Sequence, residues 1–187
     1  MSILNVSHHV STVFVTKMVD WLKSTYERLF EDGSGEMQIT RRKKHEYLRI
    51  TLDFNVPGEL KTTMIPYGKV IVELFTQYDN SKSTAATPAA EHLFKVNEDT
   101  ESLTEWQIII YPSFVAKCLF LTKQARPDIS TVVAFLSTRV KASDVNNWEK
   151  LTWMIRYLCG SIEMPLILRA DSVPVPVPIP VPVPIPK

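Results

Sequence analysis

The chain has 187 residues, of which 45% are hydrophobic and 22% are charged, a composition that is ordinary for a globular protein with a buried core. Its 21 Lys and Arg residues nearly cancel its 20 Asp and Glu residues, so a strong global basic field is excluded and nucleic-acid contact would depend on local patches. No apolar run approaches the roughly 20 residues of a transmembrane helix, and the N-terminus lacks a signal-peptide pattern. These features favour an intracellular protein, in the cytoplasm or nucleus.

The first 78 residues alternate between expected strands and helices. Hydrophobic periodicity predicts a strand over 3–8, a helix over 15–29, strands over 36–40, 45–55 and 59–65, and a helix over 66–78. Val56-Pro57-Gly58 is a turn sequence, because proline presets one backbone angle and glycine supplies a positive φ. The strands on either side of it are therefore expected to form an antiparallel hairpin.

The rest of the chain is expected to be mainly helical. Residues 79–103 are rich in Ser, Thr, Ala, Asn and acidic residues and lack sustained periodicity, which predicts an exposed linker between two lobes. A helix over 104–124, a helix pair over 126–161 and a short strand over 165–169 follow. Asp144 can cap the last helix and Gly160 can close it.

The C-terminal segment differs in kind from the rest. From Val173 to Pro186 Val or Ile alternates with Pro, so every second residue lacks a backbone donor and favours polyproline II geometry. Such a run cannot be a paired central strand. Because the prolines stand two residues apart, the PxxP pattern of SH3 ligands is absent. An extended, disordered tail over 171–187 is predicted, and the alternative is a dedicated recognition peptide.

Two stretches carry a resemblance to a known family. Residues 126–161 read RPDISTVVAFLSTRVKASDVNNWEKLTWMIRYLCGS, which resembles the region before the ribonuclease H domain of copia-type retrotransposon polyproteins. The matching positions are Arg126 to Ile129, Leu136, Ser137, Arg139, Trp148, Arg156 to Leu158 and Gly160. Tyr47-Leu48-Arg49-Ile50 resembles the YLGM or FLGI strand of the same family, with Arg49 in place of the usual glycine. A long cation at this position would either add a phosphate contact or block the primer.

The resemblance implies an α+β fragment of a reverse transcriptase. It would comprise a partial palm with an antiparallel β-hairpin and a first thumb-like helix over 1–78, an exposed linker over 79–103, a helical thumb and connection lobe over 104–170, and the Pro-rich tail over 171–187. In related polymerases the hairpin that contains Tyr47, Leu48, Arg49 and Ile50 holds the primer terminus. The implied partners are an RNA or DNA primer–template and the rest of a polyprotein.

The family activity is RNA-directed DNA polymerisation, in which carboxylates hold magnesium ions. By the register of the family's YVDD box, its two aspartates fall on Ser2 and Ile3, and neither side chain can replace a metal-binding carboxylate. The resemblance therefore implies no catalytic residue, no metal site and no cofactor in this chain, which is expected to be inactive alone. The competing interpretations are a repurposed nucleic-acid-binding or protein-interaction module, and a decayed reading frame without selected function.

Three other groups of residues could carry chemistry. The run Arg41-Arg42-Lys43-Lys44 could contact several phosphates, although a solvated connection between strands explains it as well. His8 and His9 would point to opposite faces of a strand and could not easily share a metal ion. Cys118 and Cys159 lack the spacing of a metal site and are expected to be two buried thiols.

Overall fold

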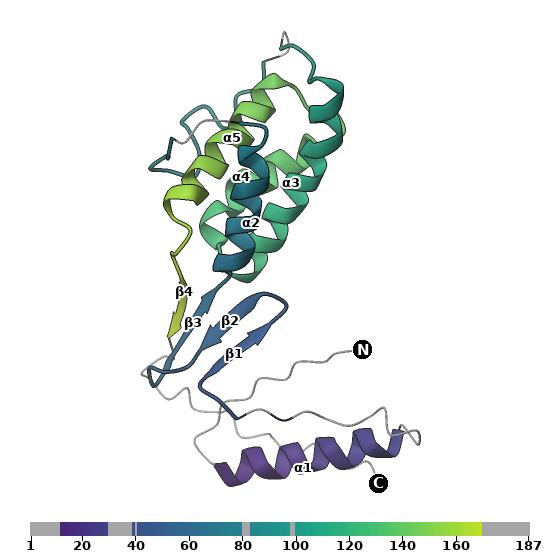
Figure 1. Ribbon diagram of the computed structural model, residues 1–187, viewed down its shortest axis with the longest axis vertical. Coiled ribbons are helices and arrows are strands. Elements are labelled where there is room, and N and C mark those ends of the chain that lie inside the picture. Colours follow the sequence, from purple (N-terminus) through teal and green to yellow (C-terminus); the bar gives the residue numbers. More distant parts are fainter. Residues whose placement is uncertain (1–11, 30–38, 40, 80–82, 98–99, 170–187) are drawn as a thin grey trace, which may run out of the picture. The chain divides into compact units, whose positions relative to one another are not determined.

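The computed structural model describes residues 12–29, 39, 41–79, 83–97 and 100–169 (Figure 1). It divides into two units, 1–43 and 44–187, and each is described by itself. Several predicted features lie outside the described residues: the strand over 3–8, the strand over 36–40 apart from Ile39, the positions Ser2 and Ile3, the pair His8 and His9, and the tail over 171–187.

The described part of the first unit is dominated by helix α1 (Thr12–Leu29), which confirms the predicted helix. None of the side chains described in it is buried, and Phe14 and Trp21 are well exposed. Within the residues described in either unit, no helix combines the length and apolar character needed to cross a membrane.

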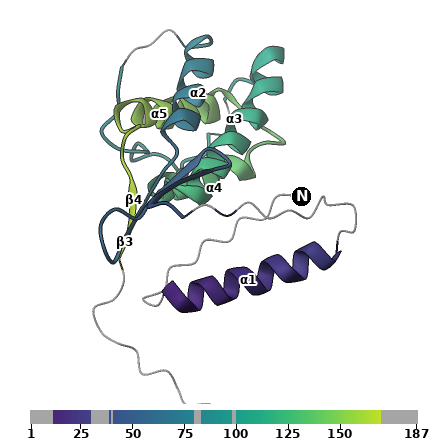
Figure 2. The same cartoon turned by 60° about the horizontal axis from the view of Figure 1, so that its bottom comes forward.

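The second unit begins with a four-stranded antiparallel sheet in the order β1 (Lys44–Tyr47), β2 (Ile50–Asp53), β3 (Glu59–Thr63), β4 (Leu166–Arg169). The short strand predicted over 165–169 is confirmed as β4, which lies beside β3 although a hundred residues separate them (Figures 1 and 2). The expected turn is also confirmed, because the Glu59 backbone N–H donates to the Val56 carbonyl at 3.1 Å. Gly58 has the positive φ, 75°, that the turn sequence predicts.

The single strand predicted over 45–55 is wrong. Leu48 and Arg49 have positive φ angles of 48° and 67° and reverse the chain, so that Tyr47 pairs with Ile50 and two strands result. No local signal in the sequence predicts this turn, because neither residue is one of the Gly, Asn or Asp residues that such a turn usually contains.

The helices of the second unit pack around one apolar core (Figure 1). They are α2 (Ile65–Thr76), α3 (Glu105–Gln124), the 3₁₀ turn η1 (Pro127–Ile129), α4 (Ser130–Thr138) and α5 (Val145–Gly160). The fully buried side chains come from all of them: Ile71, Tyr111, Cys118, Ile129, Leu136, Leu151, Met154 and Leu158. The predicted cap of α5 is confirmed, since the Asp144 carboxylate accepts from the Asn147 backbone N–H at 2.7 Å. The fold is thus α+β.

Most of the residues that the structure describes in the segment 79–103 are exposed, as its composition predicts, but two leucines anchor it to the core. Leu93 and Leu103 in it are each only 5% exposed. The Lys95 backbone carbonyl accepts from the Lys150 ammonium at 2.6 Å. This contact uses a backbone carbonyl, which every residue has, so the composition of the segment could not predict it. The helix α2 also packs against α3 and α5, so α2 to α5 form one unit without a lobe boundary at residue 79.

Candidate nucleic-acid interface

The tip of the β1–β2 hairpin is built from Tyr47, Leu48, Arg49 and Ile50, the four residues that the family resemblance singles out. Tyr47 and Ile50 are paired Cα partners, so Leu48 and Arg49 alone form the turn. Positive φ at both central residues is the type I′ arrangement that fits the right-handed twist of a hairpin. Each non-glycine residue held there costs about 1–3 kcal/mol. The chain therefore maintains a strained turn at a tip where Leu48 is 64% exposed.

The Arg49 side chain connects this tip to the helices. Its Cζ lies 5.8 Å from the centroid of the Tyr67 ring in the first turn of α2, a cation–π distance. The Tyr67 ring in turn meets Phe120 of α3 edge to face, with centroids 5.4 Å apart. Burial raises the pKa of Tyr67, whereas the Arg49 charge opposes that rise, so the phenol remains protonated at neutral pH and can donate. Its hydroxyl is 3.5 Å from the Lys117 carbonyl.

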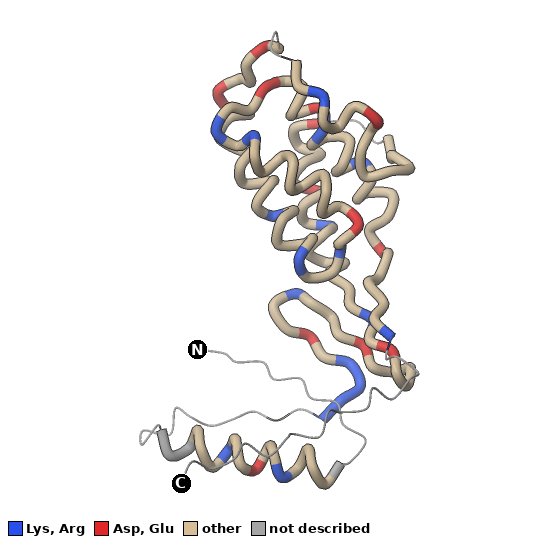
Figure 3. Tube along the Cα trace, turned by 180° about the vertical axis from the view of Figure 1, so that it is seen from behind, with Lys and Arg blue, Asp and Glu red and all other residues tan. Residues whose placement is uncertain are grey.

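The basic run Arg41 to Lys44 crosses the boundary between the two units. Lys44 is the first residue of β1 and stands opposite Asp53. The three residues before it belong to the first unit and are exposed, and Arg41 donates to the Thr16 hydroxyl at 3.3 Å. The run forms one continuous basic stretch of the trace leading into β1 (Figure 3). It is therefore contiguous along the chain, but its four cations are not assembled into one described site.

Four residues of the stretch 126–161 meet in a partly buried network, which we call the Arg126 clamp: Arg126, Asp128, Tyr157 and Ser161. Arg126 is 4% exposed and donates to both Asp128 carboxylate oxygens, at 2.9 and 2.7 Å. It also donates to the Ser161 carbonyl at 2.8 Å. The Tyr157 hydroxyl donates to Asp128 at 2.8 Å. The clamp ties the start of η1 to the end of α5.

The charges of the Arg126 clamp are stabilised by one another. Burial by itself would raise the pKa of Asp128, but hydrogen bonds from Arg126 and Tyr157 outweigh it and lower that pKa. Burial also raises the pKa of Tyr157, and its hydrogen bond to Asp128 raises it further. The carboxylate is thus ionised and the phenol protonated at neutral pH, which suits a structural ion pair rather than a proton-transfer site. The position of Asp128 in the sequence predicts only a helix-start residue.

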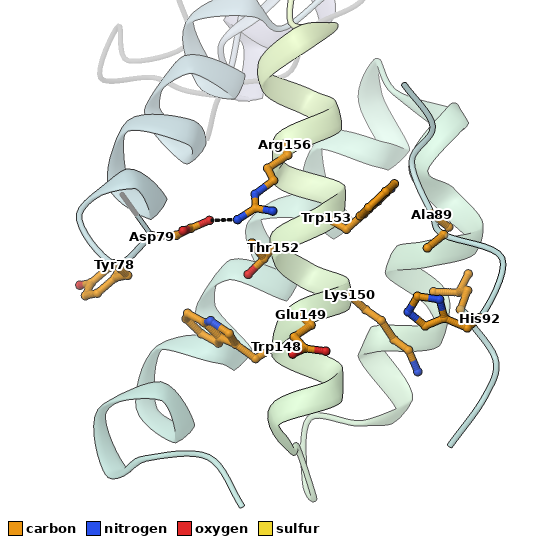
Figure 4. A pocket seen from close by; sticks show the side chains of 12 residues that line it. Tyr78, Asp79, Ala89, His92, Trp148, Glu149, Lys150, Thr152, Trp153 and Arg156 are labelled. Carbon is orange, nitrogen blue, oxygen red and sulfur yellow. Dashed lines mark hydrogen bonds and ion pairs between the residues drawn. The ribbon is translucent and has the colours of Figure 1, made fainter. Parts of the chain in front are cut away.

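A groove of about 480 Å³ runs over α5 beside residues 78–79 and 89–93 (Figure 4). Polar side chains in it bind neighbouring parts of the chain: Arg156 pairs with Asp79 at 3.1 Å, and the Trp153 indole N–H donates to the Thr87 carbonyl at 2.9 Å. These contacts hold Asp79 and Thr87 against α5. We therefore interpret the groove as part of the scaffold.

The two cysteines occupy different environments. Cys118 is fully buried, and burial raises the pKa of its thiol to about 12. Cys159 is exposed, so the expectation of two buried thiols is wrong for this residue, because it lies on the outer face of α5. Among the residues that the structure describes, no group of three or more His, Cys, Asp or Glu side chains could hold a metal ion.

Comparison with models of known protein families found no match, and searches of curated proteins and of solved structures found none either.

Proposed function

We propose that the chain is part of a copia-type reverse transcriptase and that it binds a primer–template duplex through the tip of the β1–β2 hairpin. The observation that best supports this is the φ of 67° at Arg49. This is the position at which the family sequence has glycine, the residue that adopts such an angle without strain. Arg49 thus has the backbone conformation that suits the family's glycine, although its side chain departs from the family sequence.

The hairpin tip is suited to contact a sugar-phosphate backbone. A tight turn brings main-chain N–H groups close to a ligand, and contacts of this kind position a nucleic acid without reading its sequence. The Arg49 guanidinium can donate two hydrogen bonds to one phosphate while its face remains over the Tyr67 ring. Binding is therefore expected to be independent of sequence and to weaken as salt increases.

The helices would serve as the support of this tip. Only Met64 separates β3 from α2, and Arg49 contacts Tyr67 of that helix. The Arg126 clamp joins η1 to the end of α5. In this proposal the chain performs no polymerisation alone, because Ser2 and Ile3 stand at the positions of the family's metal-binding aspartates.

The proposal is tested by the fluorescence anisotropy of a labelled primer–template duplex titrated with the full chain. Arg49→Asn removes the cation and keeps a residue that tolerates a positive φ. It is expected to raise Kd by roughly tenfold, the loss of about one charged hydrogen bond. The matched control is Arg169→Asn, which removes another exposed arginine from the same sheet and should change Kd by less than about twofold.

Two results would contradict the proposal. If the chain does not bind the duplex at low salt, it lacks the proposed binding function. If Arg49→Asn and Arg169→Asn raise the Kd equally, the hairpin tip is not the binding site. Template-dependent extension of the primer by the chain with magnesium would contradict the proposed lack of activity.

A further inference from the structure

We infer that Phe120, Tyr67 and Arg49 form a stacking shelf that binds an unpaired base beside the hairpin tip. This inference rests on the proposed function and adds a preference to it. A duplex that ends in a single-stranded extension should bind more tightly than the same duplex with a blunt end.

The shelf is assembled from three elements of the second unit. Phe120 projects from α3 and is 37% exposed. Its ring stands at 79° to the Tyr67 ring of α2, with centroids 5.4 Å apart, a favourable edge-to-face geometry. The Tyr67 ring also carries the Arg49 guanidinium of the β1–β2 turn at 5.8 Å. Tyr67 therefore orients both Phe120 and Arg49, and Phe120 presents an aromatic surface to solvent.

The charges around Phe120 indicate a nucleic acid rather than an apolar protein segment as the ligand. Lys117 and Lys123 lie three residues before and after Phe120 on α3, a spacing that puts them on the same side of the helix. No acidic residue follows Glu105 in this helix. The Lys117 ammonium donates to the Ser113 hydroxyl at 2.5 Å and lies 5.7 Å from the Phe114 ring. Positive charge on this side of α3 therefore extends from Phe120 toward Phe114. Proteins that bind single strands combine basic side chains with aromatic rings on which bases stack.

The neighbouring residue provides a matched control. Leu119 is 38% exposed, almost the same fraction as Phe120, and precedes it on the same helix. A leucine can contribute apolar area but cannot stack on a base. Changes at Leu119 and Phe120 therefore separate stacking from a general loss of apolar surface.

The test compares the binding of the full chain to a blunt DNA duplex and to the same duplex with a single-stranded extension of about five nucleotides, which fits a short binding site. The extension carries 2-aminopurine, whose fluorescence is quenched when the base stacks on an aromatic ring. The unmodified chain is expected to prefer the extended duplex by about tenfold, as one stacked base would give, and to quench the probe. Phe120→Leu should reduce this preference to less than about twofold, whatever its affinity for the blunt duplex, and should abolish the quenching.

Two further variants complete the design. Phe120→Tyr should keep both the preference and the quenching, because its ring still stacks, and Leu119→Ala should also keep both. Equal binding of the blunt and extended duplexes by the unmodified chain overturns the shelf and leaves the hairpin proposal intact. The shelf is also overturned if Phe120→Leu retains the quenching, or if Leu119→Ala removes it as completely. Failure to bind either duplex overturns the proposed function, and the shelf with it.

Discussion

Breaking the Arg126 clamp should lower the free energy of unfolding more than breaking the Asp79–Arg156 ion pair of the same unit. The Asp128 carboxylate accepts three hydrogen bonds, two from Arg126 and one from Tyr157, at 2.7 to 2.9 Å. A hydrogen bond to a charged group contributes about 1.5–3 kcal/mol, and three that share one carboxylate are not additive. Asp128→Ala leaves a guanidinium that is 4% exposed without its counter-charge. Asp128 is itself 27% exposed, and Arg126 keeps its hydrogen bonds to Ser161. The expected loss in the free energy of unfolding is therefore about 2–3 kcal/mol.

The matched control is Asp79→Ala, which breaks the ion pair between Asp79 and Arg156. These side chains are 22% and 33% exposed, so the loss should be at most about 1 kcal/mol. Urea unfolding of both variants measures the two losses, and unchanged slopes would show that both still unfold in one step. If Asp128→Ala costs no more than Asp79→Ala, the clamp is not the structural ion pair described above.

The same variant gives a dependence on pH. The pKa of Asp128 is lowered in the folded chain, so its carboxylate contributes its full stabilisation above the unfolded-state pKa of about 3.9. That contribution is lost as the pH falls through the folded-state pKa. The difference in unfolding free energy between the unmodified chain and Asp128→Ala should therefore shrink in acid below about pH 4. A difference that stays constant into acid would contradict the ion pair.

Three further predictions concern the turn, the close approach of two segments and the thiols. Arg49→Gly should raise the unfolding temperature while weakening duplex binding, because glycine adopts the φ of 67° without a strain of about 1 kcal/mol or more; a lower unfolding temperature would count against a strained turn. A Cβ at Gly160 would lie 3.2 Å from the Thr84 Cβ, so Gly160→Val should cost about 1–3 kcal/mol in urea unfolding. Thr84→Gly in the same chain should recover part of that loss, and no recovery would contradict the contact. In the folded protein a disulfide reagent should modify Cys159 and spare Cys118, whose burial raises its pKa to about 12; mass spectrometry that finds both thiols modified without denaturant would refute this.

The sequence predicted the helices well because their signals are local. Apolar residues recur at helical spacing in α4 and α5, and Asp144 precedes α5 as a cap that the structure confirms. The turn of the first hairpin was not predictable in this way. Leu48 and Arg49 continue a strand-like pattern, and only the pairing of β1 with β2 gives them their positive φ angles.

Contacts between distant segments account for the rest of what the sequence left open. The position of Asp128 suggested a helix start, whereas its main partners include Tyr157, 29 residues away. Tyr67 and Phe120 belong to different helices and meet only after folding, so no spacing along the chain indicates the shelf. Arg126, Asp128 and Tyr157 are among the positions that carry the family resemblance, but the resemblance does not indicate that they meet in the clamp.

The most direct test of the hairpin as the binding element is a photochemical cross-link to a bound primer–template duplex that carries 5-bromodeoxyuridine. After irradiation and digestion, mass spectrometry identifies the cross-linked peptide. The hairpin account predicts an adduct within Tyr47 to Ile50, at the tip where Leu48 is 64% exposed. Adducts confined to the groove over α5, around Trp153, would contradict it.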